Sequence, residues 1–363
     1  MTSGAPVSSL SIYAGPKARA AIARDGLSPD MVEVVAGAAG GPKWLVLHGL
    51  DRAVFSSWIM EREQPLHLVG SSVGSWRFAA LAQGMDALER FLAAYLAQRY
   101  TENTAQSITA EVARMLDAVM DQGGPERILS APLARLNVLA VRCRWPYTTE
   151  QRHALMLLIL KAFILNGLGR TLLSLFFSRV LFYDPRDLPP FFSMEGFPLR
   201  RVALTRLNVR QAVMASGSIP LIMEGVRDIE GAGAGMYRDA GILDYHMAIP
   251  FHSTGIVLFP HYMGRIMPGW FDKLLPWRKP SLSDMDNVVM VCPSPAFMER
   301  LPGRAIPSRD DFRTFLHRDQ ERIDWWKRVV LESERLGDEF LEIVSRGSIV
   351  EHLLPLELLA RHP

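Results

Sequence analysis

A serine between two glycines is the residue of this chain best placed to act as a nucleophile. Ser72 is the central residue of Gly-Ser-Ser-Val-Gly at 70–74, which fits the pattern G-x-S-x-G. Apolar residues 66–69 precede it and a helical run through Leu92 follows, which is the strand–turn–helix setting that presents a reactive serine. Flanking glycines remove side chains that would clash at such a turn. The alternative is a glycine-rich turn in which Ser71 or Ser72 only caps the helix.

A glycine-rich segment lies between the first predicted strand and the first long predicted helix. It reads Gly-Ala-Ala-Gly-Gly-Pro-Lys over residues 37–43, and its small side chains leave backbone N–H groups open to a reacting oxygen. Such donors stabilise a tetrahedral oxyanion, commonly by ~3 kcal/mol each. Backbone N–H groups of this segment could therefore form an oxyanion hole, with Lys43 adding positive charge. A phosphate-binding loop is excluded because proline and Trp44 occupy two positions that its pattern reserves for other residues; a plain tight turn remains the alternative.

Asp239 is the candidate general base. It begins an Asp-Ala-Gly sequence at 239–241, downstream of Ala-Ser-Gly-Ser-Ile-Pro at 215–220. A carboxylate beside a serine hydroxyl can accept the hydroxyl proton during attack and return it to the leaving alcohol. Because an unaided carboxylate is a weak base, we expect partial burial to raise the pKa of Asp239. Without the other motifs, this aspartate would be interpreted as an ordinary turn residue.

Two strand–turn–helix units position the first two motifs. Apolar residues 31–36 lead into the glycine-rich segment, residues 66–69 lead into the serine motif, and a helical run follows each. Two such units within ~60 residues predict a doubly wound α/β sheet. Other short apolar segments suit strands buried between helical layers. They lie at residues 137–143, 202–207, 254–259 and 287–292.

The segment 154–182 is dense in Leu, Ile and Phe. Lys161, Asn166 and Arg170 interrupt it, whereas a membrane-spanning helix needs ~20 nearly uninterrupted apolar residues. We therefore expect two short apolar helices, in an insertion at about 150–185. Two interpretations stay open for them: buried core, or a lid that covers an acyl site and contacts a lipid surface.

Composition limits the classes of function. Forty basic residues against 38 acidic ones leave a net charge of +2, which does not favour a nucleic-acid partner. Cys143 and Cys292 lie in separate apolar segments without metal-ligand spacing and are expected to be small buried hydrophobes. Residues 1–10 have neither a basic start nor an apolar run, so no secretory signal is expected. The expected location is the cytoplasm, with peripheral contact at the inner membrane surface left open.

The order of these motifs resembles the patatin-like phospholipase family, and in particular bacterial patatin-like serine acyl hydrolases. That family has a glycine-rich oxyanion loop, then G-x-S-x-G, then Ala-Ser-x-x-x-Pro and Asp-Gly-[Gly/Ala]; the resemblance covers roughly residues 31–260. It implies a three-layer α/β/α sandwich with a mostly parallel central sheet and a Ser72–Asp239 dyad. It also implies that the Gly40 and Gly41 amides form the oxyanion hole. It also implies lipid acyl ester substrates, phospholipids among them, and no metal or organic cofactor. The chain departs from the family pattern at Ala39 and Trp44, where glycine is usual.

The resemblance also suggests how the chain is organised. Residues 1–260 would form the catalytic domain, including the apolar insertion. Residues 261–363 would add an irregular excursion, a sheet-edge strand and a helical C-terminal region that packs on the core. This last region carries no motif that bears on chemistry.

Two other functions stay open. One is an α/β-hydrolase esterase with a Ser–Asp–His triad. The combination of Ala-Ser-x-x-x-Pro with Asp-Ala-Gly, which that fold does not predict, favours the dyad. The other is a non-catalytic protein that binds acyl lipids, against which the intact serine, aspartate and glycine motifs argue. The histidines that could complete a triad are His246, His252, His261, His317 and His352.

Overall fold

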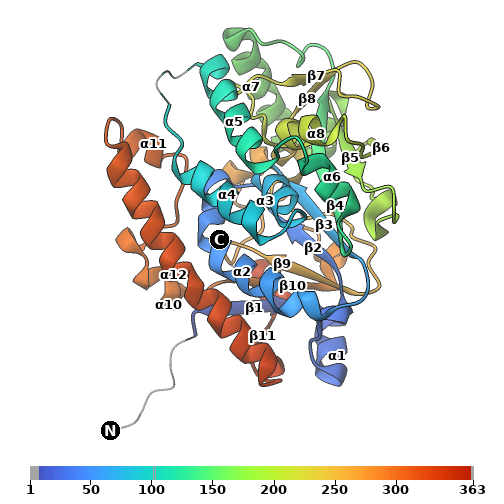
Figure 1. Ribbon diagram of the computed structural model, residues 1–363. Helices are drawn as coiled ribbons and strands as arrows, with labels where there is room; N and C mark the ends of the chain where they lie inside the picture. The colour runs from blue at the N-terminus through green and yellow to red at the C-terminus, as the bar shows by residue number, and fades with distance from the viewer. Residues whose placement is uncertain (1–7, 101, 103, 361–363) are drawn as a thin grey trace.

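A large, mostly parallel sheet forms the centre of the protein (Figure 1). The computed structural model describes residues 8–100, 102 and 104–360, and in that part of the chain the sheet has eleven strands. Its middle is five parallel strands in the order β10-β9-β2-β3-β4. Their bounds are β2 Val32–Gly37, β3 Leu66–Ser71, β4 Ala134–Cys143, β9 Ile256–Pro260 and β10 Val288–Pro293. Burial on both faces explains their nearly continuous apolar sequences.

Other strands extend both sides of this parallel centre. Beyond β4, β5 (Phe177–Tyr183) runs antiparallel to it and β6 (Leu199–Ala203) runs parallel to β5. Beyond β10, β1 (Leu10–Ala14) runs antiparallel to it and β11 (Leu353–Pro355) runs parallel to β1. A short hairpin of β7 (Val226–Arg227) and β8 (Met236–Arg238) joins through β8, which pairs antiparallel with β4.

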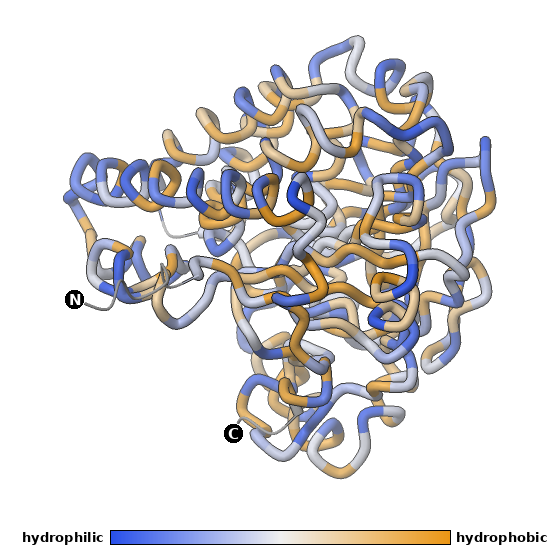
Figure 2. Tube along the Cα trace, turned by 90° about the horizontal axis from the view of Figure 1, so that it is seen from below, coloured by the Kyte–Doolittle hydropathy of each residue, from blue (hydrophilic) through white to orange (hydrophobic). Residues whose placement is uncertain are grey.

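Helices complete an α/β/α sandwich, so the predicted fold class is confirmed. In Figure 1, α2, α3, α4 and the long α12 lie in front of the central strands. Figure 2 shows hydrophobic residues along the strands and hydrophilic residues mainly on the outer helices and loops. The helix bounds are α1 Pro16–Asp25, α2 His48–Ser56, α3 Val73–Leu81, α4 Met85–Leu96, α5 Ala105–Val119, α6 Gly124–Ser130, α7 Arg152–Leu168, α8 Val209–Gly217, α9 Gly241–Asp244, α10 Pro295–Arg300, α11 Asp311–Thr314, α12 Asp319–Ser345 and α13 Ile349–His352. Among the 3₁₀ segments, η2 covers Gly41–Leu47, η4 covers Arg170–Leu175 and η6 covers Trp270–Leu274.

The C-terminal helix α12 packs directly on α2. The Gly49 N–H donates to Ser333 Oγ at 3.0 Å, and a side chain on Gly337 would lie 2.4 Å from the Gly49 carbonyl oxygen. Such close approach of two helix backbones needs glycine at the crossing. Trp326 and Phe340 on the same helix are fully buried. The helical C-terminal region thus packs on the core, as its sequence pattern indicated.

The apolar segment differs from its prediction in the second half. The first expected helix is α7, but the second is reduced to the 3₁₀ turns of η4, and residues 177–183 form β5 inside the sheet. The prediction of a helical insertion up to about residue 185 is therefore wrong beyond η4. The physical reason is that β5 has hydrogen-bonding partners on both edges and is buried along nearly its whole length. A fully buried strand and a buried helix give the same short apolar run.

The described part of the region 261–363, which ends at residue 360, supplies two strands rather than one. The predicted strand at 287–292 corresponds to β10, which lies inside the sheet because β1, a strand that the sequence analysis did not predict, covers its outer side. The sheet-edge strand is β11. Among the described residues, no helix is both long enough and apolar enough to cross a membrane. Residues 1–7, which contributed to the expectation of a missing secretory signal, lie outside the described residues.

Candidate active site

Ser72 occupies a sharp turn between β3 and α3. The strand ends at Ser71 and the helix begins at Val73, so Ser72 alone makes the turn, with φ 54° and ψ −126°. A non-glycine residue with positive φ is strained, and such strain concentrates at functional sites. Side chains at Gly70 and Gly74 would lie 2.3 Å from the Ser75 nitrogen and 2.2 Å from the Gly37 oxygen, respectively. The two glycines of the motif are therefore required by close backbone packing.

Strand β4 brings Ser72 and Asp239 together. Along one edge of β4, β3 pairs as far as Ser71 opposite Leu139, and β5 occupies the other edge. Because β5 also pairs with residues 141–143, β8 must use the edge that β3 uses, with Arg238 opposite Val141. The antiparallel strands β3 and β8 thus approach each other end to end. Ser72 directly follows β3 and Asp239 directly follows β8, so these two residues meet.

The Ser72 hydroxyl donates a hydrogen bond to the Asp239 carboxylate. Ser72 Oγ lies 2.7 Å from Asp239 Oδ2, and the other carboxylate oxygen, Oδ1, accepts from the Gly241 N–H at 2.6 Å. Both side chains are buried. Burial raises the pKa of Asp239, and this effect outweighs the opposing influence of Arg309 and of the hydrogen bonds from Ser72 and Gly241. The raised pKa agrees with the expectation for a carboxylate acting as a base without histidine.

The Ala-Ser-x-x-x-Pro segment supports both residues. Ser216, on α8, accepts the Ser72 N–H at 2.9 Å and lies 2.9 Å from the Ser75 hydroxyl. Its carbonyl accepts from the Ala240 N–H at 3.1 Å, while the Ser218 carbonyl accepts from the Asp239 N–H at 3.0 Å. The segment therefore binds both the turn at Ser72 and the loop at Asp239, and holds their backbones next to each other. The sequence analysis identified this motif but assigned it no physical role.

The glycine-rich loop passes directly beside this pair. The carbonyl oxygens at residues 37 and 38 border the start of α3 at Gly74, and a side chain at Gly241 would come within 3.3 Å of Ala39 Cβ. Gly41 begins η2 with φ 56°. Among the described residues, the N–H groups of Gly40 and Gly41 have no hydrogen-bond acceptor, whereas the Ala39 N–H donates to the Tyr245 carbonyl at 2.8 Å. The two predicted donors are thus left for a substrate oxygen.

Trp44 has a structural role in place of the usual glycine. Its ring is buried and stacks on Phe91 of α4, with ring centroids 4.6 Å apart, and meets Tyr95 edge to face. These contacts attach η2 to the helical layer. The Trp44 side chain therefore anchors the C-terminal end of the glycine-rich loop.

Three cationic side chains surround the loop and Asp239. Lys43 Nζ lies 5.1 Å from the Tyr262 ring centroid, and Lys273 Nζ lies 4.0 Å from the Tyr245 ring centroid. Arg309 lies over Gly41, since a Cβ there would be 2.9 Å from its Nε. Among the described residues, none of the three cations forms an ion pair with a carboxylate. Asp310 is a carboxylate close enough to act on Lys43 and Lys273, so three cations and one further anion surround the buried aspartate.

Two of these cations were missed by the sequence analysis. Lys273 and Arg309 come from the region beyond residue 260, which carries no motif, and only the fold brings them to the loop. Although Lys273 keeps contact with solvent, partial burial lowers its pKa to about 8, and the charges of Lys43 and Arg309 act in the same direction. Burial likewise lowers the pKa of Lys43.

The nearby histidines bind other groups. His246 Nε2 lies 2.6 Å from the Tyr262 hydroxyl, His261 Nδ1 lies 2.6 Å from the Met263 carbonyl, and His252 lies 3.0 Å from Glu195. Burial lowers the pKa of His246 well below its ordinary value and that of His261 to about 3, so both rings are neutral. Among the described residues, no histidine hydrogen bonds with Ser72 or Asp239.

The apolar helix α7 lies next to the aspartate loop. Its inner side packs in a small second core that includes Ile242 and Leu243, just after Asp239. Arg170, the first residue of η4, also donates to the Leu243 carbonyl. The outer side of α7 is exposed and apolar. Its exposed residues, between 48% and 77% exposed, are Met156, Leu157, Leu160, Ile164 and Leu168. The helix therefore serves partly as core and partly as an apolar surface.

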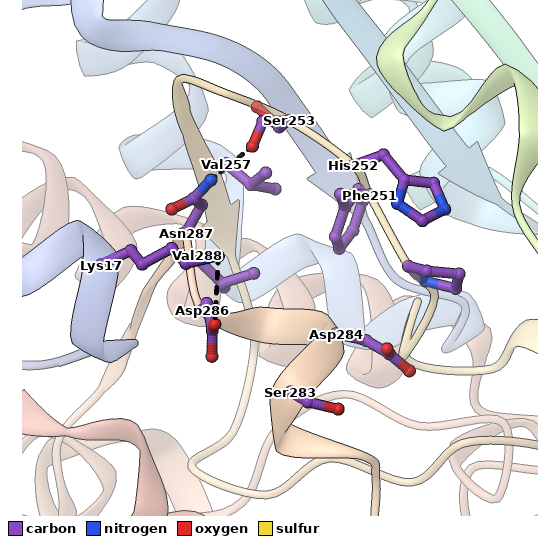
Figure 3. A pocket seen from close by; sticks show the side chains of 11 residues that line it. Lys17, Phe251, His252, Ser253, Val257, Ser283, Asp284, Asp286, Asn287 and Val288 are labelled. Atoms are coloured by element: carbon purple, nitrogen blue, oxygen red, sulfur yellow. Dashed lines mark hydrogen bonds and ion pairs between the residues drawn. The ribbon is translucent and has the colours of Figure 1, made fainter.

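Two surface cavities lie at the amino ends of the central strands, at the other end of the sheet from Ser72. One, of about 270 Å³, is lined by residues at the amino ends of β9 and β10, including Phe251, His252 and Asn287 (Figure 3). There Lys17 pairs with Asp286 at 3.4 Å, and Asn287 donates to the Ser253 carbonyl. The other lies at the amino ends of β2, β3 and β9. Ser72 follows the carboxyl end of β3, which is the edge where parallel α/β sheets place their ligands.

The two cysteines are buried and form no disulfide, in line with the expectation from their surroundings. Burial raises the pKa of Cys143 and that of Cys292 to about 12 each. Neither thiol is therefore suited to act as a nucleophile.

No protein-family model matches this chain, and no curated protein matches it. The chemistry of the site is therefore argued from its own geometry.

Proposed function

We propose that this protein is a serine acyl hydrolase that cleaves carboxylic esters of lipids with a Ser72–Asp239 dyad. The observation that carries the proposal is the 2.7 Å hydrogen bond from Ser72 Oγ to Asp239 Oδ2 at a strained strand-to-helix turn. A nucleophile within hydrogen-bonding reach of a base is the expected arrangement for covalent catalysis. The order of motifs, which resembles patatin-like phospholipases, agrees with this reading.

The proposed reaction has two halves. Ser72 Oγ attacks the ester carbonyl while Asp239 takes the hydroxyl proton, and the N–H groups of Gly40 and Gly41 stabilise the oxyanion. Collapse of the tetrahedral intermediate releases the alcohol, which takes the proton from Asp239. A water molecule then attacks the acyl-Ser72 ester, again with Asp239 as base, and releases the fatty acid. The raised pKa of Asp239 makes its carboxylate a stronger base toward the hydroxyl proton.

The surroundings of the dyad support a lipid substrate with an anionic group. Lys43, Lys273 and Arg309 would attract a phosphate close to the scissile ester. The exposed apolar side of α7 would rest on a lipid surface, where burying one large aliphatic side chain is worth ~1.5–3 kcal/mol. Phospholipids fit both features, with peripheral contact at a membrane surface.

The two alternative functions receive less support. A Ser–Asp–His triad would need a histidine bonded to the aspartate, whereas His246, His252 and His261 bind other groups. A non-catalytic lipid-binding protein would not need a buried serine–aspartate hydrogen bond beside two unpaired loop amides.

Kinetics with p-nitrophenyl butyrate test the proposal. Ser72→Ala should abolish hydrolysis with little change in thermal melting, because the hydroxyl contributes almost no packing. Asp239→Asn should lower the rate by ~10³-fold, near the typical contribution of a general base. Retention of most of the wild-type rate by Ser72→Ala would move the nucleophile elsewhere and overturn the proposal.

A further inference from the structure

A buried chain of hydrogen bonds ends on the oxyanion loop. The Tyr262 hydroxyl donates to the Ala39 carbonyl at 2.7 Å, and His246 Nε2 lies 2.6 Å from the same hydroxyl. On its other side, His246 Nδ1 lies 3.0 Å from the Met267 nitrogen. Tyr262 and His246 are almost completely buried, and neither touches the dyad by a hydrogen bond. The mechanism above uses neither residue.

The donors of this chain determine the direction of its protons. The Met267 N–H can only donate, so His246 Nδ1 accepts and Nε2 carries the ring proton. Nε2–H then donates to the Tyr262 hydroxyl, whose own proton goes to the Ala39 carbonyl. The opposite tautomer would bond to the Arg265 carbonyl, 3.1 Å from Nδ1, but it would leave the Met267 N–H and the Ala39 carbonyl unpaired. Burial, with Tyr245 acting in the same direction, raises the pKa of Tyr262 well above its ordinary value, so its hydroxyl keeps its proton.

The Ala39 carbonyl and the Gly40 N–H belong to one peptide unit. A trans peptide is planar, and its C=O and N–H bonds point in opposite directions. Holding the Ala39 oxygen therefore sets the direction of the Gly40 N–H on the other side of the loop. The Tyr262 ring also packs against Gly40, where a Cβ would lie 2.7 Å from the ring. Without the tyrosine hydroxyl, this peptide unit loses the hydrogen bond that fixes its orientation, and the glycine on its C-terminal side permits it to rotate.

We propose that Tyr262, oriented by His246, is a positioning residue that holds the 39–40 peptide with the Gly40 N–H directed at the oxyanion. This inference rests on the proposed function, because it assigns the Gly40 amide to the oxyanion hole. It places His246 in the machinery as a neutral support for the loop, not as a base. The close contact of the Tyr262 ring also explains why the loop has glycine at 40.

The test is Tyr262→Phe, which keeps the ring and removes only the hydroxyl. Loss of one oxyanion donor costs about 10²–10³-fold in kcat, and a donor that is only misdirected part of the time should cost about tenfold to a hundredfold. KM for a neutral soluble ester should stay within about twofold, because the ground-state carbonyl gains little from the hole. The affinity of an alkyl trifluoromethyl ketone, which forms an oxyanion adduct on Ser72, should fall by the same factor as kcat.

Tyr147→Phe is the matched control. Tyr147 is likewise buried, and its hydroxyl donates to a backbone carbonyl, that of Leu158, at 2.8 Å. This variant should lower the melting temperature as much as Tyr262→Phe while leaving kcat and ketone affinity unchanged. If Tyr262→Phe does not fold, the same two measurements are made on His246→Gln. There kcat and ketone affinity should each fall by about threefold to tenfold. The double variant should be no worse than Tyr262→Phe alone, since both act through one hydrogen-bond chain.

Unchanged kcat and unchanged ketone affinity in folded Tyr262→Phe, or in His246→Gln when that variant stands in for it, would overturn the inference. Such a result leaves the proposed function intact, because Ser72 would still react. Absence of hydrolysis and of ketone binding in the wild-type protein would instead remove the proposed function itself.

Discussion

Ser216 Oγ accepts the backbone N–H of Ser72 at 2.9 Å, which ties the nucleophile turn to a helix 144 residues further along the chain. The N–H is buried and has this hydroxyl as its acceptor. A strained residue keeps its conformation only when the surrounding structure holds it there. Ser216 is thus a support for the geometry of Ser72.

Ser216→Ala should therefore weaken both stability and catalysis. Leaving a buried N–H without its acceptor costs ~1–3 kcal/mol, and a looser turn should lower kcat more than it raises KM. Ser218→Ala is the matched control, because that hydroxyl only bonds the Met214 carbonyl one helical turn earlier. Equal effects of the two substitutions on kcat, measured beside thermal melting, would contradict a special role for Ser216.

Asp239 should make both activity and stability depend on pH. The pKa of Asp239 in the native state is raised above the ordinary 3.8. At pH values between the ordinary pKa and the native pKa, the native state therefore binds more protons than the unfolded chain. Stability must then fall as pH rises through that window. Asp239→Asn mimics the protonated form and should melt above wild type at neutral pH, with the difference vanishing in acid. The wild-type rate should fall in the same window as pH is lowered, because the base becomes protonated; equal melting temperatures at every pH would refute this account.

Lys273 should give anionic substrates a pH dependence that neutral ones lack. Its pKa is lowered to about 8, so the charge is present below that pH and is lost above it. KM for a short-chain anionic phospholipid should rise severalfold from about pH 7 to about pH 9, while KM for a neutral ester stays flat. Lys273→Arg keeps its charge and should abolish the rise. If Lys273→Arg shows the same rise as wild type, this lysine does not contact the anionic group.

The exposed side of α7 should mediate binding to lipid surfaces. Leu157→Ser with Leu160→Ser removes two side chains that are 70% and 54% exposed, so folding should be unaffected. Binding to phospholipid vesicles, measured by sedimentation, should weaken at least tenfold, since each buried aliphatic group is worth ~1.5–3 kcal/mol. Leu331→Ser on α12, with a side chain 63% exposed, is the control. An equal loss of binding in the control would assign the interaction to general hydrophobicity.

Local patterns were sufficient to predict the strand-to-helix turn at Ser72, the glycine-rich loop and the order of the five central strands along the chain. Strand–turn–helix units leave a clear mark in sequence, because buried strands are apolar and tight turns need glycine. The relation of Ser72 to Asp239 depended on a third element, β4, whose register with β3 and β8 no local pattern records. The order of the motifs suggested the pairing, and the register gives its physical reason.

The parts that sequence could not predict are set by distant packing. Residues 177–183 have the composition of a buried helix or strand, and only their partners β4 and β6 decide between the two. Lys273, Arg309 and Tyr262 come from segments without any motif. They reach the site because the C-terminal third of the chain folds back on the sheet, bringing Tyr262 to Ala39 and Arg309 to Gly41.

Covalent labelling with a fluorophosphonate tests the central claim most directly. Intact-mass measurement should detect one adduct per chain, and peptide mapping should place it on Ser72. Ser72→Ala should take up no label, and folded Asp239→Asn should react far more slowly, while His252→Ala should react like wild type because that side chain lies at the protein surface near Glu195. An adduct on another residue, or full labelling of Ser72→Ala, would contradict the account of Ser72 and Asp239 as a catalytic dyad.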